Sequence, residues 1–162
     1  MPIAWSKMDE ITIETKKSKE EESRGRVYAN PDLCTGCGLC MAACSVRLFG
    51  EAAPRKSAIR IKRDLFEGYE IQFLCRHCDE PRCVEACFMG NIIKDPRTGL
   101  VCSRPDDCVG CWSCLMVCPY NSIRQVYYDS LGRKVAVKCD GCPEREIPAC
   151  VMVCPTQALV FR

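Results

Sequence analysis

The chain has 162 residues, a formal net charge of +2 and seventeen cysteines, whereas only 7% of its residues are aromatic. This length bounds it to one compact domain, and the near-neutral charge gives no indication of nucleic-acid binding. No stretch approaches the roughly 20 consecutive apolar residues that a membrane-spanning helix needs. Many cysteines with few aromatic side chains predict that bound metal replaces much of the usual apolar core, so that folding depends on metal.

Residues 1–26 are polar and carry as many basic as acidic side chains. They contain neither the apolar core of a secretory signal nor a twin arginine. We therefore expect a cytoplasmic protein, unless a partner's signal carries it across a membrane in the folded state. The composition favours a flexible arm. The alternative is an arm that wraps around a partner and is anchored by Ile3, Trp5, Ile11 and Ile13.

Sixteen of the cysteines fall into four groups of four. In chain order the groups are Cys34, Cys37, Cys40 and Cys44; Cys75, Cys78, Cys83 and Cys87; Cys108, Cys111, Cys114 and Cys118; and Cys139, Cys142, Cys150 and Cys154. Groups one and three have the spacing C-x2-C-x2-C-x3-C of bacterial [4Fe–4S] ferredoxins, in which the fourth thiolate ligates the other cluster. Glycine precedes the second cysteine in groups one, three and four and lets the backbone curl around a cluster, whereas His77 takes that place in group two. The count predicts four [4Fe–4S] clusters.

Short strand pairs alternate with these groups. The residue types and turn signals predict strands at 57–63 and 69–74, at 92–94 and 100–102, at 123–128 and 134–137, and a closing strand at 158–161. Short helices are expected to begin inside the cysteine groups, for example at 39–48 and 113–118. Strand pairs and short helices around clusters predict an α+β fold, a duplicated bacterial-type ferredoxin at residues 27–162.

Two other interpretations of the cysteines are disfavoured. Structural zinc is held by two cysteine pairs with a spacer between them, whereas here the third cysteine usually follows after only two residues. A disulfide framework suits small secreted domains, and this chain has no secretory signal.

The internal repeat leaves two ways to combine the groups. Sequential pairing joins one with two and three with four, whereas nested pairing joins one with four and two with three. Proline follows only groups three and four, at Pro119 and Pro155. Nesting would give each half one such group, which is a weak argument for nesting, and the spacing leaves both pairings open.

Several segments carry a resemblance to a known family. They are CRHCDEPRCVEAC at 75–87, CVGCWSCLMVCPY at 108–120 and KCDGCPEREIPACVMVCPTQAL at 138–159. Here the chain resembles the four-cluster electron-transfer subunits of molybdenum and tungsten oxidoreductases, such as the dimethyl sulfoxide reductase iron–sulfur subunit. CSVRLFG at 44–50 and PRKSAIRI at 54–61 are similar to the small soluble branch that serves carbon monoxide dehydrogenases and tungsten aldehyde-oxidoreductase-type enzymes.

The resemblance implies the nested pairing and four ligand sets. The first set is Cys34, Cys37, Cys40 and Cys154; the second is Cys139, Cys142, Cys150 and Cys44; the third is Cys75, Cys78, Cys83 and Cys118; the fourth is Cys108, Cys111, Cys114 and Cys87. Some relatives lack the second cysteine of group three and hold a three-iron cluster there. Because Cys111 is present, a full cluster is expected.

The resemblance also implies a function in electron transfer without catalysis by this chain. The four clusters would connect a larger tungsten- or molybdenum-pterin catalytic subunit to an external donor or acceptor, such as ferredoxin. The sequence contains no dinucleotide-binding or phosphate-binding glycine motif. The alternatives are a free polyferredoxin, a carbon monoxide dehydrogenase-associated carrier, and a maturation or redox-sensing protein.

A few residues near the groups are expected not to be ligands. Cys102 is expected to be a small buried hydrophobe. His77, the one histidine, is either a loop residue or a hydrogen-bond donor to a cluster sulfur. Trp112 is expected to shield a cluster from water. A basic run is either a solvated face or a docking surface for an acidic carrier, and it comprises Arg55, Lys56, Arg60, Lys62 and Arg63.

Overall fold

The computed structural model describes residues 25–64, 66 and 68–162. The arm expected at residues 1–26, with its proposed anchors Trp5 and the three isoleucines, lies almost wholly outside the described residues.

The strands form four separate two-stranded antiparallel sheets. The strands are β1 (Val27–Ala29), β2 (Arg60–Asp64), β3 (Tyr69–Phe73), β4 (Ile92–Lys94), β5 (Val101–Ser103), β6 (Arg124–Tyr128), β7 (Arg133–Val137) and β8 (Leu159–Phe161). Three sheets are local hairpins, β2–β3, β4–β5 and β6–β7, whereas the fourth joins the two chain ends as β1–β8 with Tyr28 opposite Val160. Residues near the two ends of the described chain are therefore neighbours.

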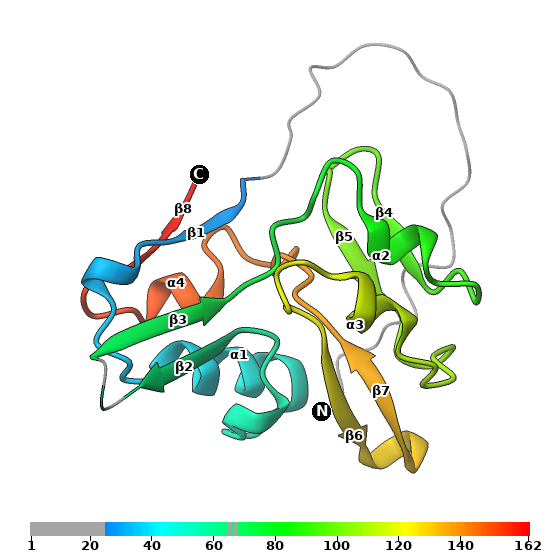
Figure 1. Ribbon diagram of the computed structural model, residues 1–162, viewed down its shortest axis with the longest axis horizontal. Helices are drawn as coiled ribbons and strands as arrows, with labels where there is room; N and C mark the ends of the chain where they lie inside the picture. The colour runs from blue at the N-terminus through cyan, green and yellow to red at the C-terminus, as the bar shows by residue number, and fades with distance from the viewer. Residues whose placement is uncertain (1–24, 65, 67) are drawn as a thin grey trace.

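The described residues form four short α-helices, α1 (Leu39–Phe49), α2 (Arg82–Glu85), α3 (Ser113–Val117) and α4 (Ala149–Met152). The 3-10 turns η2 (Pro31–Leu33) and η3 (Pro54–Lys56) precede and follow α1, and η4 (Asp129–Leu131) connects β6 with β7. Helix α1 packs against α4, and α2 packs against α3. Figure 1 shows two lobes, one with β1, β8, α1, α4 and the β2–β3 hairpin, the other with α2, α3 and the remaining hairpins. The first lobe thus combines an early and a late segment of the chain, whereas the second is built from the continuous segment between them.

The longest helix has clear local boundaries. Gly38 and Gly50 flank α1 with φ angles of 77° and 76°, a left-handed conformation that glycine adopts without steric cost. The Gly50 N–H donates to the Val46 carbonyl and ends the helix. Ser45 is fully buried, and its Oγ donates to the Ala42 carbonyl and accepts from the Ala53 N–H. These contacts fix the chain that leaves α1.

The predicted elements are largely confirmed. The three hairpins, the closing strand and the helices predicted at 39–48 and 113–118 all occur, with boundaries displaced by up to three residues. The sequence prediction missed β1, because its partner β8 lies at the other end of the described chain and no turn beside β1 signals a hairpin. Mixed short helices and small sheets agree with the predicted α+β class.

Each lobe has its own apolar core, and both cores contain cysteines. One core gathers Ile92, Val101, Ile123, Val126, Val135 and Val137 with Cys108 and Cys114; the other gathers Val27, Ile59, Leu74 and Leu159 with Cys40 and Cys150. Thiols thus occupy positions that aliphatic side chains usually fill. Within the described part of the chain, no helix has the length and apolarity required to cross a bilayer.

Candidate functional site

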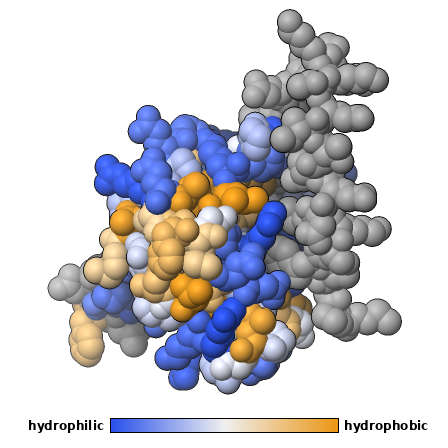
Figure 2. Space-filling view, turned by 90° about the vertical axis from the view of Figure 1, so that its right-hand side faces the viewer, coloured by the Kyte–Doolittle hydropathy of each residue, from blue (hydrophilic) through white to orange (hydrophobic). Residues whose placement is uncertain are grey.

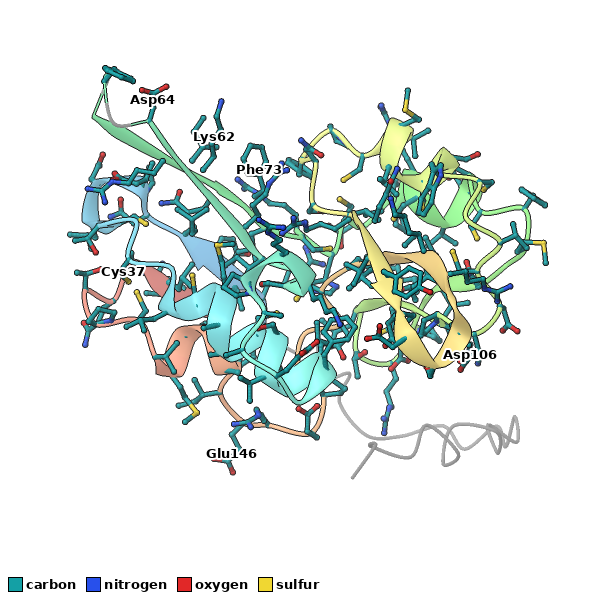
Figure 3. The ribbon with its side chains drawn as sticks, turned by 90° about the horizontal axis from the view of Figure 1, so that it is seen from below. Cys37, Lys62, Asp64, Phe73, Asp106 and Glu146 are labelled. Atoms are coloured by element: carbon teal, nitrogen blue, oxygen red, sulfur yellow. The ribbon has the colours of Figure 1, made fainter. Side chains whose placement is uncertain are left out.

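The four thiols of the first set line one cavity. Ile61 of β2, Gln72 of β3 and Leu159 of β8 provide part of its wall. The space between atoms there is about 360 Å³, some of it open to solvent. Cys37 is exposed and lies at one end of the molecule, far from Asp106, as Figure 3 shows. The first cavity therefore lies at the outer end of its lobe.

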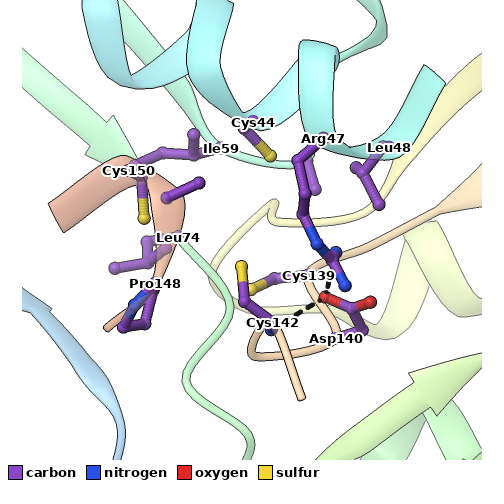
Figure 4. A pocket seen from close by; sticks show the side chains of 12 residues that line it. Cys44, Arg47, Leu48, Ile59, Leu74, Cys139, Asp140, Cys142, Pro148 and Cys150 are labelled. Atoms are coloured by element: carbon purple, nitrogen blue, oxygen red, sulfur yellow. Dashed lines mark hydrogen bonds and ion pairs between the residues drawn. The ribbon is translucent and has the colours of Figure 1, made fainter. Parts of the chain in front are cut away.

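The second set lines a cavity beside α1. Figure 4 shows Cys44 reaching down from α1 towards Cys139, Cys142 and Cys150. The apolar part of the wall comes from Leu48, Ala58, Ile59, Leu74, Pro148 and Ala149. Ile59 is only 2% exposed, so this wall keeps water away from the thiols.

The fourth set lines a cavity in the other lobe. Met89, Val109, Trp112 and Ala136 complete its lining, with Asn91 among the thiols. Cys111 is exposed, whereas Cys108 and Cys114 are buried. The Ala136 N–H donates to Cys108 Sγ at 3.3 Å, so β7 contributes a backbone hydrogen bond to this set. Trp112 lies where the shielding prediction placed it.

The third set is brought together less completely. Cys83 on α2 lies close enough to Cys75 and Cys118 for their charges to raise the pKa of its thiol, although burial is the larger cause. Cys78 is half-buried and follows His77 in the same loop. The proximity of Cys75, Cys83 and Cys118 is the arrangement that the nested pairing requires.

Two pairs of helices divide their cysteines between cavities. Cys40 and Cys44 lie one helical turn apart on α1, and Cys40 lines the first cavity while Cys44 lines the second. The segment around α4 does the reverse, because Cys150 on α4 lines the second cavity and Cys154, two residues past the end of α4, lines the first. Helices α2 and α3 relate the third and fourth sets in the same way, through the pairs Cys83 and Cys87, and Cys114 and Cys118.

The electrostatics of the thiols test whether these sets suit a metal cluster. Burial, with the charges of neighbouring thiols added, raises the pKa of Cys40 to about 11, of Cys114 to about 11 and of Cys150 to about 12. Four thiolates in such a cavity repel one another and are poorly solvated, so they need a positively charged centre to hold them. An iron–sulfur core fits this donor set. No three Cys, His, Asp or Glu side chains of the described residues are grouped so that they could hold a single metal ion.

The loops between ligands turn through left-handed backbone. Gly36, Gly110 and Gly141 have φ angles of 66°, 73° and 78°, and His77 takes the equivalent place with 44°. A Cβ at Gly141 would lie 2.8 Å from the Leu100 side chain, so the close approach of these chains requires glycine. The Gly141 N–H donates to Cys139 Sγ at 3.4 Å, as expected for a loop whose amides face the ligand sulfurs.

Comparison with known families identifies the class of protein. Residues 69–162, more than half of the chain, match the 4Fe-4S dicluster domain, and residues 26–88 match a second family of the same description. The chain belongs to the 4Fe-4S dicluster family. This dicluster protein therefore has [4Fe–4S] clusters as its cofactors.

Individual relatives agree with the family. The dicluster protein is 38% identical over 139 residues to Protein NrfC of Escherichia coli (strain K12), a match that covers 80% of this chain and 60% of NrfC. It is 33% identical over 137 residues to the polyferredoxin-like subunit of aliphatic sulfonate oxidoreductase of Pyrococcus furiosus, covering 85% and 75%. Among solved structures, the active-site complex BamBC of benzoyl-coenzyme A reductase matches with a TM-score of 0.46 and 20% identity, over 85% of this chain and 75% of that one. The dicluster protein thus spans less than two thirds of the length of NrfC.

A partly buried ion-pair network borders the second cavity of the dicluster protein. Arg47 of α1 binds Asp140 through Nη1 at 2.6 Å (Figure 4). Its Nε and Nη2 donate to the two carboxylate oxygens of Glu144, each at 2.6 Å. Asp140 also accepts from the Cys142 N–H at 3.0 Å. The guanidinium of Arg47 lowers the pKa of Glu144. The sequence prediction missed this network, because its partners lie more than 90 residues apart.

Lys138 is a second cation that sequence reasoning missed. Its side chain is buried at the end of β7, directly before Cys139. Burial lowers the pKa of this ammonium. The negative charges of nearby thiols raise it by more, so that the net shift is upward; these thiols are Cys75, Cys139, Cys102 and Cys83. The sequence did contain a signal for this buried lysine, because Lys138 stands between an apolar strand and the predicted ligand Cys139.

The remaining candidates have defined places. His77 is 2% exposed, and its Nδ1 accepts from the Val101 N–H at 3.0 Å. His77 is thus a buried loop residue held by β5, and a hydrogen bond from it to a cluster sulfur stays a prediction. Cys102 lies half-buried on β5, with Sγ 3.9 Å from the Asp140 carbonyl, and lines none of the three cavities described above. In the basic run, Lys56 is paired with Glu51 and Asp129, and Arg63 with Glu70.

Proposed function

We propose that the four sets hold four [4Fe–4S] clusters and that the chain is an electron-transfer subunit of a larger oxidoreductase. When bound, a [4Fe–4S] cluster takes up and releases one electron without breaking a bond. The thiols of this chain would provide sixteen ligands, and the apolar walls would keep them dry. The nested pairing is part of the proposal, and it is supported by the three cavities and by the proximity of Cys75, Cys83 and Cys118.

The observation that carries this proposal is the continuous order of the sets. The charge of Cys40 in the first set contributes to the raised pKa of Cys150 in the second. The charge of Cys75 in the third set likewise contributes to the raised pKa of Cys139 in the second. Helices α2 and α3 then relate the third set to the fourth. The row begins and ends at exposed thiols, Cys37 and Cys111, where another protein could approach.

The surface near the fourth set supports a partner. Phe88, Met89, Val109 and Met116 are all exposed there, and Met116 is 85% exposed. Figure 2 shows apolar side chains gathered on the face formed by this lobe. Contiguous exposed apolar surface is typical of protein–protein interfaces.

We further propose that the partner is a tungsten- or molybdenum-pterin enzyme of the aldehyde-oxidoreductase type. The resemblance of residues 44–61 to the small soluble branch supports this choice. The likeness to the polyferredoxin-like subunit of an oxidoreductase supports the role of a subunit. A carbon monoxide dehydrogenase or a free polyferredoxin is the alternative, and the cytoplasmic location stays a prediction.

Native purification tests the proposal. Anaerobically prepared protein should contain about sixteen iron atoms and as many sulfides per chain. In native extract the chain should elute with a larger protein that contains tungsten or molybdenum. Iron near twelve would leave one set empty, and stoichiometric zinc would overturn the cluster assignment. A chain that elutes alone at 18.2 kDa and still exchanges electrons would be a free carrier.

A further inference from the structure

Lys138 is the only lysine or arginine among the described residues whose side chain is fully buried, with 3% exposure. It follows β7 (Arg133–Val137), whose last three residues are buried as well. Moving an ammonium group out of water costs several kcal/mol unless other groups compensate for the lost hydration. The surroundings of Lys138 must therefore supply both hydrogen-bond acceptors and negative charge.

Two backbone carbonyls supply the acceptors. Lys138 Nζ donates to the Val101 carbonyl of β5, and to the Cys139 carbonyl at 2.8 Å. These carbonyls hold the ammonium in one position between β5 and the loop of the fourth cysteine group. Because carbonyls are neutral dipoles, they leave the positive charge uncancelled.

No carboxylate cancels that charge in the described part of the chain. Lys138 forms no ion pair with Asp or Glu there, and the nearby Asp140 is already bound to Arg47 at 2.6 Å. The charges that act most strongly on Lys138 are those of Cys75, Cys139, Cys102 and Cys83. Arg47, the cation beside the second cavity, differs because two carboxylates neutralise it.

Three of those four cysteines belong to ligand sets. Cys139 belongs to the second set, and Cys75 and Cys83 belong to the third. The hydrogen bonds give the same placement, because Lys138 Nζ binds the Cys139 carbonyl of the second set and the Val101 carbonyl. The Val101 N–H in turn binds His77, next to Cys78 of the third set, so the cation lies between two neighbouring sets. A positive charge inside a protein interacts strongly with nearby charge because the surrounding dielectric is low. One added electron makes a cluster and its thiolates more negative, and the potential of an iron–sulfur cluster depends on nearby charge.

We propose that Lys138 is a fixed buried cation that stabilises the reduced state of the clusters held by the second and third sets and raises their reduction potentials. This inference rests on the proposed four-cluster function. Lys138 would act on the clusters through its charge, and it is therefore a positioning residue. A role limited to tying β5 to the following loop would require its hydrogen bonds but not its charge.

Three variants separate the charge from the hydrogen bonds. Lys138→Met removes both, Lys138→Gln keeps a donor without charge, and Lys138→Arg keeps the charge. Lys56→Met is the control, because Lys56 is a partly exposed lysine paired with Glu51 and Asp129. Each anaerobic protein is first analysed for iron and then titrated with EPR detection of the reduced clusters.

The expected result is a selective shift in Lys138→Met and Lys138→Gln. Both should retain the wild-type iron content. Two of the four reduction potentials should fall by at least about 59 mV, which corresponds to a tenfold lower affinity for one electron. Lys138→Arg and Lys56→Met should leave all four potentials near their wild-type values. Unchanged potentials in the two neutral variants, or an equal shift of all four, would overturn the proposal.

A measurement on wild-type protein covers the case in which both neutral variants lose iron. Lysine labelled with ¹⁵N at Nζ alone is incorporated, and the partly reduced protein is studied by pulsed EPR. A ¹⁵N coupling to a reduced cluster supports the proposal, and its absence overturns it. Failure of the four-cluster function would instead appear as wild-type iron well below about sixteen atoms, before any variant is compared.

Discussion

Cys40 and Cys44 lie one turn apart on the same helix, yet their thiols line different cavities. Cys40 joins Cys154 from the C-terminal end of the chain, and Cys44 joins Cys150 of α4. Because α1 packs against α4, Cys150 of α4 meets Cys44 at the second cavity, and the chain that follows α4 brings Cys154 to the first. The proposed nested pairing is based on this crossing.

Replacing Cys44 tests the crossing directly. Cys44→Ala should remove the cluster held with Cys139, Cys142 and Cys150, because alanine offers no ligand. We expect iron to fall by about four atoms per chain, with the cluster at Cys34, Cys37 and Cys40 intact by EPR. Loss of the first-set cluster with the second intact would refute the nested pairing.

The seventeenth cysteine provides a matched control. Cys102→Ala should retain the full iron content, because Cys102 lines none of the three cavities and its Sγ lies 3.9 Å from a backbone carbonyl. Iron and sulfide analysis beside Cys44→Ala makes the comparison. A loss of about four iron atoms in Cys102→Ala would make Cys102 a ligand and would require a different set.

Removal of Arg47 should weaken the fold around the second cavity. Arg47→Met leaves Asp140, which is 12% exposed, and Glu144 without their cation. Breaking one side of a largely buried ion pair costs about 3 kcal/mol. We expect faster loss of the cluster absorbance on heating, with Arg145→Met as the control because its guanidinium lies 3.7 Å from Glu144 and is 43% exposed. Equal stability of the two variants would contradict this role.

His77 should matter through its hydrogen bond to β5. His77→Ala leaves the buried Val101 N–H without its acceptor, which costs about 1–3 kcal/mol. His77→Asn offers a side-chain acceptor and tolerates a positive φ better than most residues, so it should recover part of the loss. Thermal midpoints of cluster loss compare the variants, and an unchanged midpoint in His77→Ala would show that the contact adds no stability.

Removal of iron should unfold the described part of the chain. Cysteines occupy both cores, and without metal their buried thiolates repel or take up protons. Treatment with a chelator and oxidant should abolish cooperative melting by circular dichroism, and anaerobic iron and sulfide should restore it. Cooperative melting of the iron-free chain would mean that its aliphatic core suffices.

The sequence by itself determined the elements whose signals are local. Cysteine spacing indicated the cofactor class, and turn residues such as Asp95-Pro96 and Gly99 marked the hairpins, because a tight turn depends on the φ preferences of its own residues. Helix α1 was likewise predicted within one residue, since Gly38 and Gly50 delimit it.

Only the tertiary structure decided which distant groups meet. Spacing left nested and sequential pairing open, and the pairing of β1 with β8 and the packing of α1 on α4 bring the first and last cysteine groups together. The contacts of Arg47 with Asp140 and of Lys138 with Val101 likewise join residues that are 93 and 37 positions apart. A charge on a side chain has no sequence signature for its partner, because burial and proximity arise only when the chain has closed on itself.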